Sequence, residues 1–117
     1  MLKIAVLVFA IAAVGGLIMA TRVLAGRLAP WALSLLHAAL GATGLVLTAL
    51  VVLGKSADVA SIVTVALLLL VVAALGGFFL ASFHARKQLP PRAVVFVHAG
   101  VAVIGFLLLL GGAFHFI

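Results

Sequence analysis

Four long apolar runs, separated by short polar breaks, decide what this chain can fold into. They cover residues 3–24, 31–53, 58–83 and 92–115. An α-helix needs about 20 mostly apolar residues to cross the hydrocarbon core of a bilayer. With 69% hydrophobic residues, a chain of 117 residues has more apolar surface than a small soluble domain can bury. We therefore predict an all-α integral membrane four-helix bundle, with residues 1–117 forming a single transmembrane domain.

The breaks between the runs contain residues that begin or end helices. Pro30 and Pro91 close the first and third breaks, where proline suits a helix start better than a helix interior. The middle break is a short polar turn that includes Gly54 and Asp58. The first run begins near Lys3 and has features of a signal peptide. Because it matches the third run, we interpret it as a helix that stays in the membrane.

The few charges predict the orientation of the helices. Five of the seven basic residues lie in or beside the first and third breaks: Arg22, Arg27, Arg86, Lys87 and Arg92. Lys3 and Lys55, with Asp58, belong to the opposite side. Because basic residues collect in cytoplasmic loops, we expect these two breaks in the cytoplasm and both termini outside. A bacterial inner membrane would suit this arrangement.

Several classes of function are disfavoured by composition. The basic residues are few and lie between apolar runs, so we expect no nucleic-acid partner. The absence of cysteine excludes disulfides, thiolate-held iron–sulfur clusters and a covalently attached c-type haem. The single acid, Asp58, is expected in a turn, which argues against proton-coupled cation export and against hydrolysis by a carboxylate pair. We assign no catalytic residue.

The two halves of the chain match without gaps at an offset of 61 residues. The matches least expected in an apolar sequence are Gly15 with Gly76, Gly16 with Gly77, Pro30 with Pro91, His37 with His98, and Gly44 with Gly105. We predict two tandem two-helix repeats, about residues 1–56 and 62–117; the alternative is chance similarity within a biased composition. Repeats that each cross the membrane twice share one orientation, so the second and fourth runs are equivalent.

His37 and His98 each lie seven residues after a proline, in these two equivalent runs. They are therefore expected at one depth, roughly 10 Å from the cytoplasmic helix ends. An ionisable residue inside a membrane points to function. Small or polar residues share a helix face with the histidines: Ser34, Gly41, Gly44 and Thr48 in the second run, and Ala102, Gly105 and Gly112 in the fourth. Such a stripe suits close helix packing or contact with a flat cofactor.

Haem b is the cofactor that this pattern favours. Two neutral imidazoles can occupy both axial positions of one iron, and bundle cores hold such sites. We predict one haem b per chain, with His37 and His98 as its iron ligands. Four small residues are expected to pack against it: Gly41, Gly44, Ala102 and Gly105. Four arginines are candidate partners for its propionates: Arg22, Arg27, Arg86 and Arg92.

The remaining polar side chains give weaker signals. His84 and His115 have no counterpart in the other half, and we expect neither to bind a metal. Met19 is an alternative axial ligand, but its counterpart is Leu80, and a methionine in the core or facing lipid is far more common.

In architecture the chain resembles four-helix bis-histidine b-type membrane cytochromes, the b561-type proteins and haem-bearing membrane anchors among them. The resemblance covers the four runs and the pair His37 and His98. Such proteins often hold two haems, but a second symmetric histidine pair is missing here. The resemblance implies an electron-transfer subunit, not an enzyme on its own. It would relay electrons between quinone and a partner in a larger redox complex, surrounded by membrane lipids.

Two other interpretations stay open at this point. The chain could be a cofactor-free structural or accessory subunit, whose histidines form hydrogen bonds between helices. It could also bind a chlorophyll-type pigment, with each histidine ligating magnesium. Two facing histidines at one depth suit a single iron better than two separate pigments.

Overall fold

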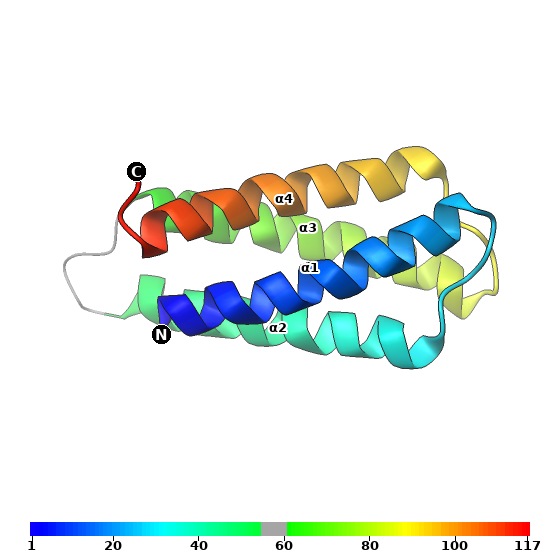
Figure 1. Ribbon diagram of the computed structural model, residues 1–117, viewed down its shortest axis with the longest axis horizontal. Helices are drawn as coiled ribbons and strands as arrows, with labels where there is room; N and C mark the ends of the chain where they lie inside the picture. The colour runs from blue at the N-terminus through cyan, green and yellow to red at the C-terminus, as the bar shows by residue number, and fades with distance from the viewer. Residues whose placement is uncertain (55–60) are drawn as a thin grey trace.

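Four long helices form the protein. The computed structural model describes residues 1–54 and 61–117, and it contains α1 (Leu2–Leu24), α2 (Trp31–Leu53), α3 (Ser61–Ala85) and α4 (Arg92–Ala113) (Figure 1). Each helix is long and apolar enough to cross a membrane. The predicted all-α membrane bundle is confirmed at this level. Lys55 and Asp58, which we placed in the middle break, lie outside the described residues.

The helix ends differ slightly from the predicted ones. The bounds of α2 agree, whereas α3 ends two residues later than predicted. Its predicted start lies outside the described residues. Helix α4 ends at Ala113 instead of 115 because His115 adopts a left-handed conformation with φ 58°. The backbone N–H of Phe116 then donates to the Gly111 carbonyl at 2.8 Å, which closes the helix end.

The helices are arranged as two hairpins that lie against each other. Helix α1 packs closely on α2 and α3 on α4, while the contacts of α1 with α4 and of α2 with α3 are sparser. The helices therefore follow one another around the bundle, and α2 and α4 occupy opposite corners. Both termini lie at one end, here called the terminal end (Figure 1). The α1–α2 and α3–α4 loops lie at the other, here called the loop end.

The two loops at the loop end have the same backbone design. Gly26, after α1, and Lys87, after α3, adopt left-handed conformations with φ 83° and φ 56°. In each case the next residue's N–H donates to the carbonyl five residues earlier, at 2.9 Å. This is the pattern of a Schellman helix end. Each loop then runs to a proline, Pro30 or Pro91, directly before the next helix.

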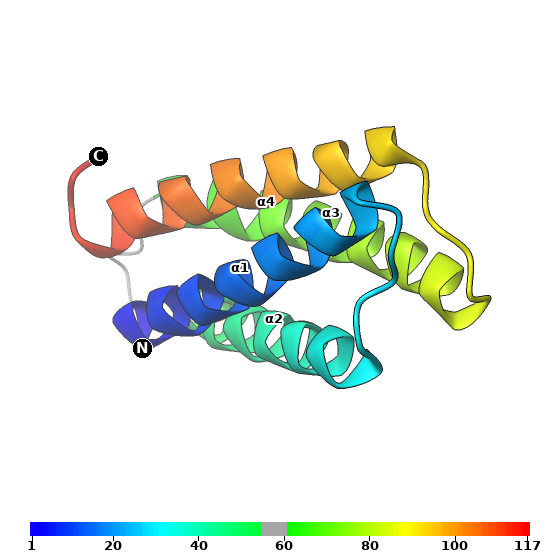
Figure 2. The same cartoon turned by 45° about the vertical axis from the view of Figure 1, so that its right-hand side comes forward.

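The packed core is concentrated toward the terminal end. Its buried apolar residues are Val6, Phe9, Val63, Ala66, Leu70, Leu109 and Ala113. Toward the loop end, across residues 13–24, 31–43, 74–85 and 92–104, Val95 is the one buried residue. Helices α2 and α4 diverge toward this end in both views (Figures 1 and 2). Fewer side chains are therefore buried near the loop end than in the core.

Candidate functional site

His37 on α2 and His98 on α4 meet across the diagonal of the bundle. Their ring centroids lie 6.3 Å apart, and the ring planes are inclined by 77°. Both side chains are half-buried. The sequence predicted a shared depth for the two rings, and the structure brings the rings together in the interior.

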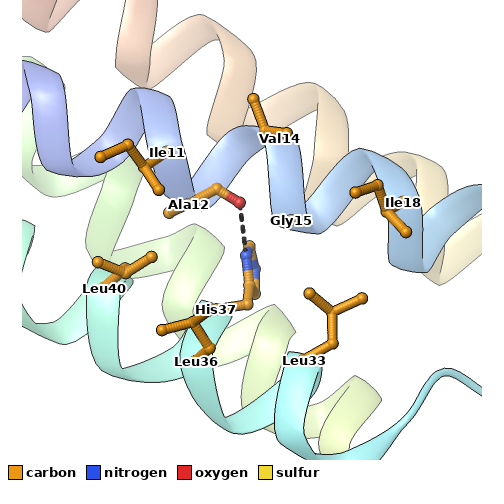
Figure 3. A pocket seen from close by; sticks show the side chains of 9 residues that line it. All are labelled: Ile11, Ala12, Val14, Gly15, Ile18, Leu33, Leu36, His37 and Leu40. Carbon is orange, nitrogen blue, oxygen red and sulfur yellow. Dashed lines mark hydrogen bonds between the residues drawn. The ribbon is translucent and has the colours of Figure 1, made fainter.

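Each histidine is fixed by a backbone carbonyl of the neighbouring helix. His37 Nδ1 lies 2.8 Å from the Ala12 carbonyl oxygen on α1 (Figure 3), and His98 Nδ1 lies 2.7 Å from the Ala73 carbonyl oxygen on α3. A carbonyl oxygen only accepts, so in each ring Nδ1 carries the hydrogen and donates it. In a neutral imidazole this leaves Nε2 as the acceptor or metal-binding atom.

Each ring also lies directly over a glycine of the same neighbouring helix. A Cβ atom placed on Gly16 would be 2.9 Å from Cε1 of His37. A Cβ atom on Gly77 would be 3.2 Å from Cε1 of His98. The backbone of α1 and of α3 therefore comes close to an imidazole where these glycines lie.

Two of the small residues predicted to contact a cofactor lie in the packed core. A Cβ atom on Gly44 would be 2.7 Å from the Phe9 ring, and one on Gly105 would be 3.0 Å from Leu70. A macrocycle could reach these two glycines only if Phe9 and Leu70 moved. Gly41, by contrast, has no neighbouring atom within 4 Å of an added Cβ. Ala102 is half-buried, one turn after His98.

The four candidate arginines lie at the loop end with their side chains exposed. Arg92 donates from Nη2 to the Leu24 carbonyl at 3.0 Å, which places a cation at the C-terminus of α1. Arg86 donates from Nε to the Ser82 carbonyl at 3.1 Å. Its guanidinium also lies 4.7 Å from the centre of the Phe83 ring. The remaining two, Arg22 and Arg27, are likewise exposed.

His84 and His115 are not part of the histidine pair. The His84 imidazole stacks on the indole of Trp31, with ring centroids 4.0 Å apart and planes 11° apart. His115 follows the end of α4, near the terminal end. Sequence reasoning missed the stack of Trp31 on His84. The signal was available, because Trp31 begins α2 and His84 lies in the last turn of the antiparallel α3.

A shallow hollow lies on the outer side of α1 and α2 (Figure 3). It has a volume of about 200 Å³ and is lined by aliphatic side chains of both helices, with His37 as its one polar member. Sites for small-molecule ligands usually exceed about 300 Å³. We therefore place the candidate site between the two imidazoles and not in this hollow.

The histidine pair supplies only two donor atoms. Within residues 1–54 and 61–117, no group of three or more His, Cys, Asp or Glu side chains could hold a metal ion. A metal between His37 and His98 would therefore need further ligands other than the His, Cys, Asp and Glu side chains of the described residues. No protein-family model, curated protein or solved structure matches the chain.

Proposed function

We propose that this protein is a small b-type cytochrome subunit that binds one haem b between His37 and His98. The observation that carries the proposal is the 6.3 Å separation of the two ring centroids. With metal–nitrogen bonds of about 2 Å, two imidazoles on one metal have ring centres about 6 Å apart. The spacing of the pair therefore suits two ligands of one iron.

The hydrogen bonds of the two rings support the same assignment. Histidines that bind a metal through one nitrogen usually donate the other N–H to a carbonyl or carboxylate. His37 and His98 both donate from Nδ1, to the carbonyls of Ala12 and Ala73. These bonds fix the tautomer and the ring orientation, and they raise the basicity of Nε2. Both rings thus have the arrangement expected of metal ligands.

The surroundings of the pair also fit a porphyrin. A porphyrin supplies four nitrogen ligands, which complements a protein site with only two donors. The loop half of the bundle has few buried side chains, and α2 and α4 diverge there. Gly41 and Ala102 lie one turn from the histidines on the side toward the core. Exposed arginines at the loop end are available to pair with propionates.

Haem, when bound, supplies one-electron redox chemistry. The chain would hold the iron through His37 and His98, orient both rings through backbone carbonyls, and limit access of water with apolar helices. Because both axial positions would be protein ligands, we infer electron transfer instead of oxygen activation. The electron partners we propose are a membrane quinone and another subunit of a redox complex. We keep the proposed orientation, with the loop end in the cytoplasm of a bacterial inner membrane.

We also propose that the two hairpins are copies of one unit. Ala12 and Ala73, the acceptors for the histidines, are separated by the same 61 residues as His37 and His98. The same offset relates the left-handed turns at Gly26 and Lys87. It also relates Gly16 to Gly77 beneath the two rings. Backbone features that recur at one offset support duplication better than similarity of composition does.

A cofactor-free structural subunit is the second candidate. The observation in its favour is that each Nδ1 hydrogen bond already links the two helices of its own hairpin. Such bonds between membrane helices contribute about 0.6 kcal/mol on average. Under this interpretation His37 and His98 would act in packing alone, and the purified protein would contain no tetrapyrrole.

Haem content of histidine variants tests the proposal. The protein would be expressed in haem-replete cells and purified in mild detergent. A pyridine haemochrome assay and a reduced-minus-oxidised spectrum should give one low-spin haem b per chain. His37→Ala and His98→Ala should each remove it, while His84→Ala and His115→Ala should retain it. Full haem content in both of the first two variants would overturn the assignment. A protein without haem would favour the structural subunit, and extracted chlorophyll would favour a pigment protein.

A further inference from the structure

We propose that Gly16 and Gly77 are positioning residues for His37 and His98. Each glycine would keep space for an imidazole ring and thereby set the direction of its Nε2 atom. The expected effect on haem rests on the proposed function, but the contact between glycine and ring does not. The inference assigns Gly16 and Gly77, which are matched in sequence, a role more specific than helix packing.

The clearance over Gly16 is too small for a methyl group, and the clearance over Gly77 is tight. A Cβ atom on Gly16 would lie 2.9 Å from Cε1, 3.4 Å from Nδ1 and 3.7 Å from Nε2 of His37. The corresponding distances from Gly77 to the His98 ring are 3.2, 3.7 and 3.9 Å. Real Cβ atoms essentially never approach another heavy atom closer than 3.0 Å. In Gly16→Ala the imidazole of His37 would therefore have to move.

The hydrogen bond at Nδ1 restricts how each ring can move. Ala12, which accepts from His37, lies one helical turn before Gly16, and residues four apart share a helix face. Ala73 and Gly77 have the same relationship to His98. A ring displaced by a methyl group must therefore stretch this hydrogen bond or rotate about it. Either movement redirects Nε2.

The neighbouring glycines provide matched controls. A Cβ atom on Gly15 would be 3.6 Å from Leu33, and one on Gly76 would be 3.7 Å from His98 Cβ and Nδ1. Both are ordinary van der Waals distances. Alanine favours a helix more than glycine does, so all four Gly→Ala variants should keep their helices. Circular dichroism and size-exclusion chromatography would check this directly.

Haem titration is the first test. Outer contacts that orient a metal ligand typically change metal affinity by about 10- to 100-fold when they are altered. We expect Gly16→Ala to weaken haem binding by about this factor and to shift the reduction potential. Gly77→Ala should have a smaller effect because its clearance is larger. Gly15→Ala and Gly76→Ala should match the unchanged protein in both measurements.

Nitrogen-15 NMR of the imidazole rings provides a second test, which needs no haem. In haem-free protein, Gly16→Ala should shift the ring signals of His37, and Gly77→Ala those of His98, beyond the shifts in the control variants. Unchanged ring signals in both variants would overturn the inference, even if the protein proved to bind haem. If the unchanged protein binds no haem, the proposed function fails, while the ring signals still decide whether the glycines position the histidines.

Discussion

The imidazole of His84 stacks on the indole of Trp31, with ring centroids 4.0 Å apart and planes 11° apart. This contact joins the last turn of α3 to the first residue of α2 at the loop end. The hairpins meet along two contacts, α2 with α3 and α1 with α4. In the second, Arg92 at the start of α4 donates to the Leu24 carbonyl at the end of α1. At the loop end, an aromatic stack therefore joins α2 to α3, whereas a charged hydrogen bond joins α1 to α4.

We predict a measurable coupling energy between Trp31 and His84. Aromatic pairs contribute about 0.5–1.5 kcal/mol beyond the burial of their area. A double-mutant cycle of Trp31→Ala and His84→Ala, followed by reversible unfolding in detergent, should give a coupling in this range. Because the stack is separate from the histidine pair, haem content should not change. Strict additivity of the two substitutions would contradict an energetic role for the stack.

Arg92→Met should destabilise the protein through the C-terminus of α1. It removes both the hydrogen bond to the Leu24 carbonyl and a cation beside the negative end of the helix dipole. We expect a loss of about 0.3–1 kcal/mol in unfolding free energy, decreasing as salt is added. Arg27→Met is the matched control, since Arg27 is exposed at the same end and makes no side-chain hydrogen bond in the described part of the chain. Equal effects of the two variants would count against this capping role.

Gly44→Ala should strain the core between α1 and α2. The added methyl group would lie 2.7 Å from the Phe9 ring, which is itself buried. Overpacking of this kind costs about 1–3 kcal/mol. Gly41→Ala, one turn away, meets no atom within 4 Å and should be neutral or slightly stabilising. The unfolding temperatures of both variants check this. A decrease in Gly44→Ala alone would show a steric clash with Phe9, whereas equal decreases would show a general effect of replacing glycine in α2.

Phe9→Leu should relieve the strain of Gly44→Ala. In the second hairpin a leucine takes the place of Phe9: a Cβ atom on Gly105 would lie 3.0 Å from Leu70, compared with 2.7 Å from Gly44 to the Phe9 ring. A leucine at position 9 can move its flexible end, whereas a flat ring in a filled core cannot. The double variant should therefore unfold at a higher temperature than Gly44→Ala alone. Two destabilisations that simply add would argue against direct contact between these residues.

Sequence reasoning predicted the helices well because lipid imposes a simple rule on length and polarity. Prolines mark the starts of α2 and α4, and both starts agree with the structure. The end of α4 was wrong by two residues because Phe114 and Phe116 are apolar enough to continue the run. The left-handed conformation of His115, which ends the helix, has no signature in hydropathy.

The site was predicted less completely than the fold. The two histidines could be paired because they are polar and rare, and the structure brings their rings together. Their acceptors at Ala12 and Ala73 could not be predicted, because every residue has a backbone carbonyl. The rotation of α1 and α3 about their axes decides which carbonyl faces the histidine. The same reason applies to Gly44, which we expected beside a cofactor. The rotation of α1 instead places Phe9 over it.

Each hairpin contributes one imidazole to the facing pair, so the pair exists only when the two hairpins are docked. A molecule bound by both rings would favour the docked hairpins over separated ones, and mass action would convert its binding free energy into stability of the bundle. Because the hairpins contact each other sparsely, such a ligand would supply a large share of the free energy that holds them together. Loading of the pair and docking of the two hairpins would then be linked equilibria, and any ligand shared by the rings would also stabilise the assembled bundle.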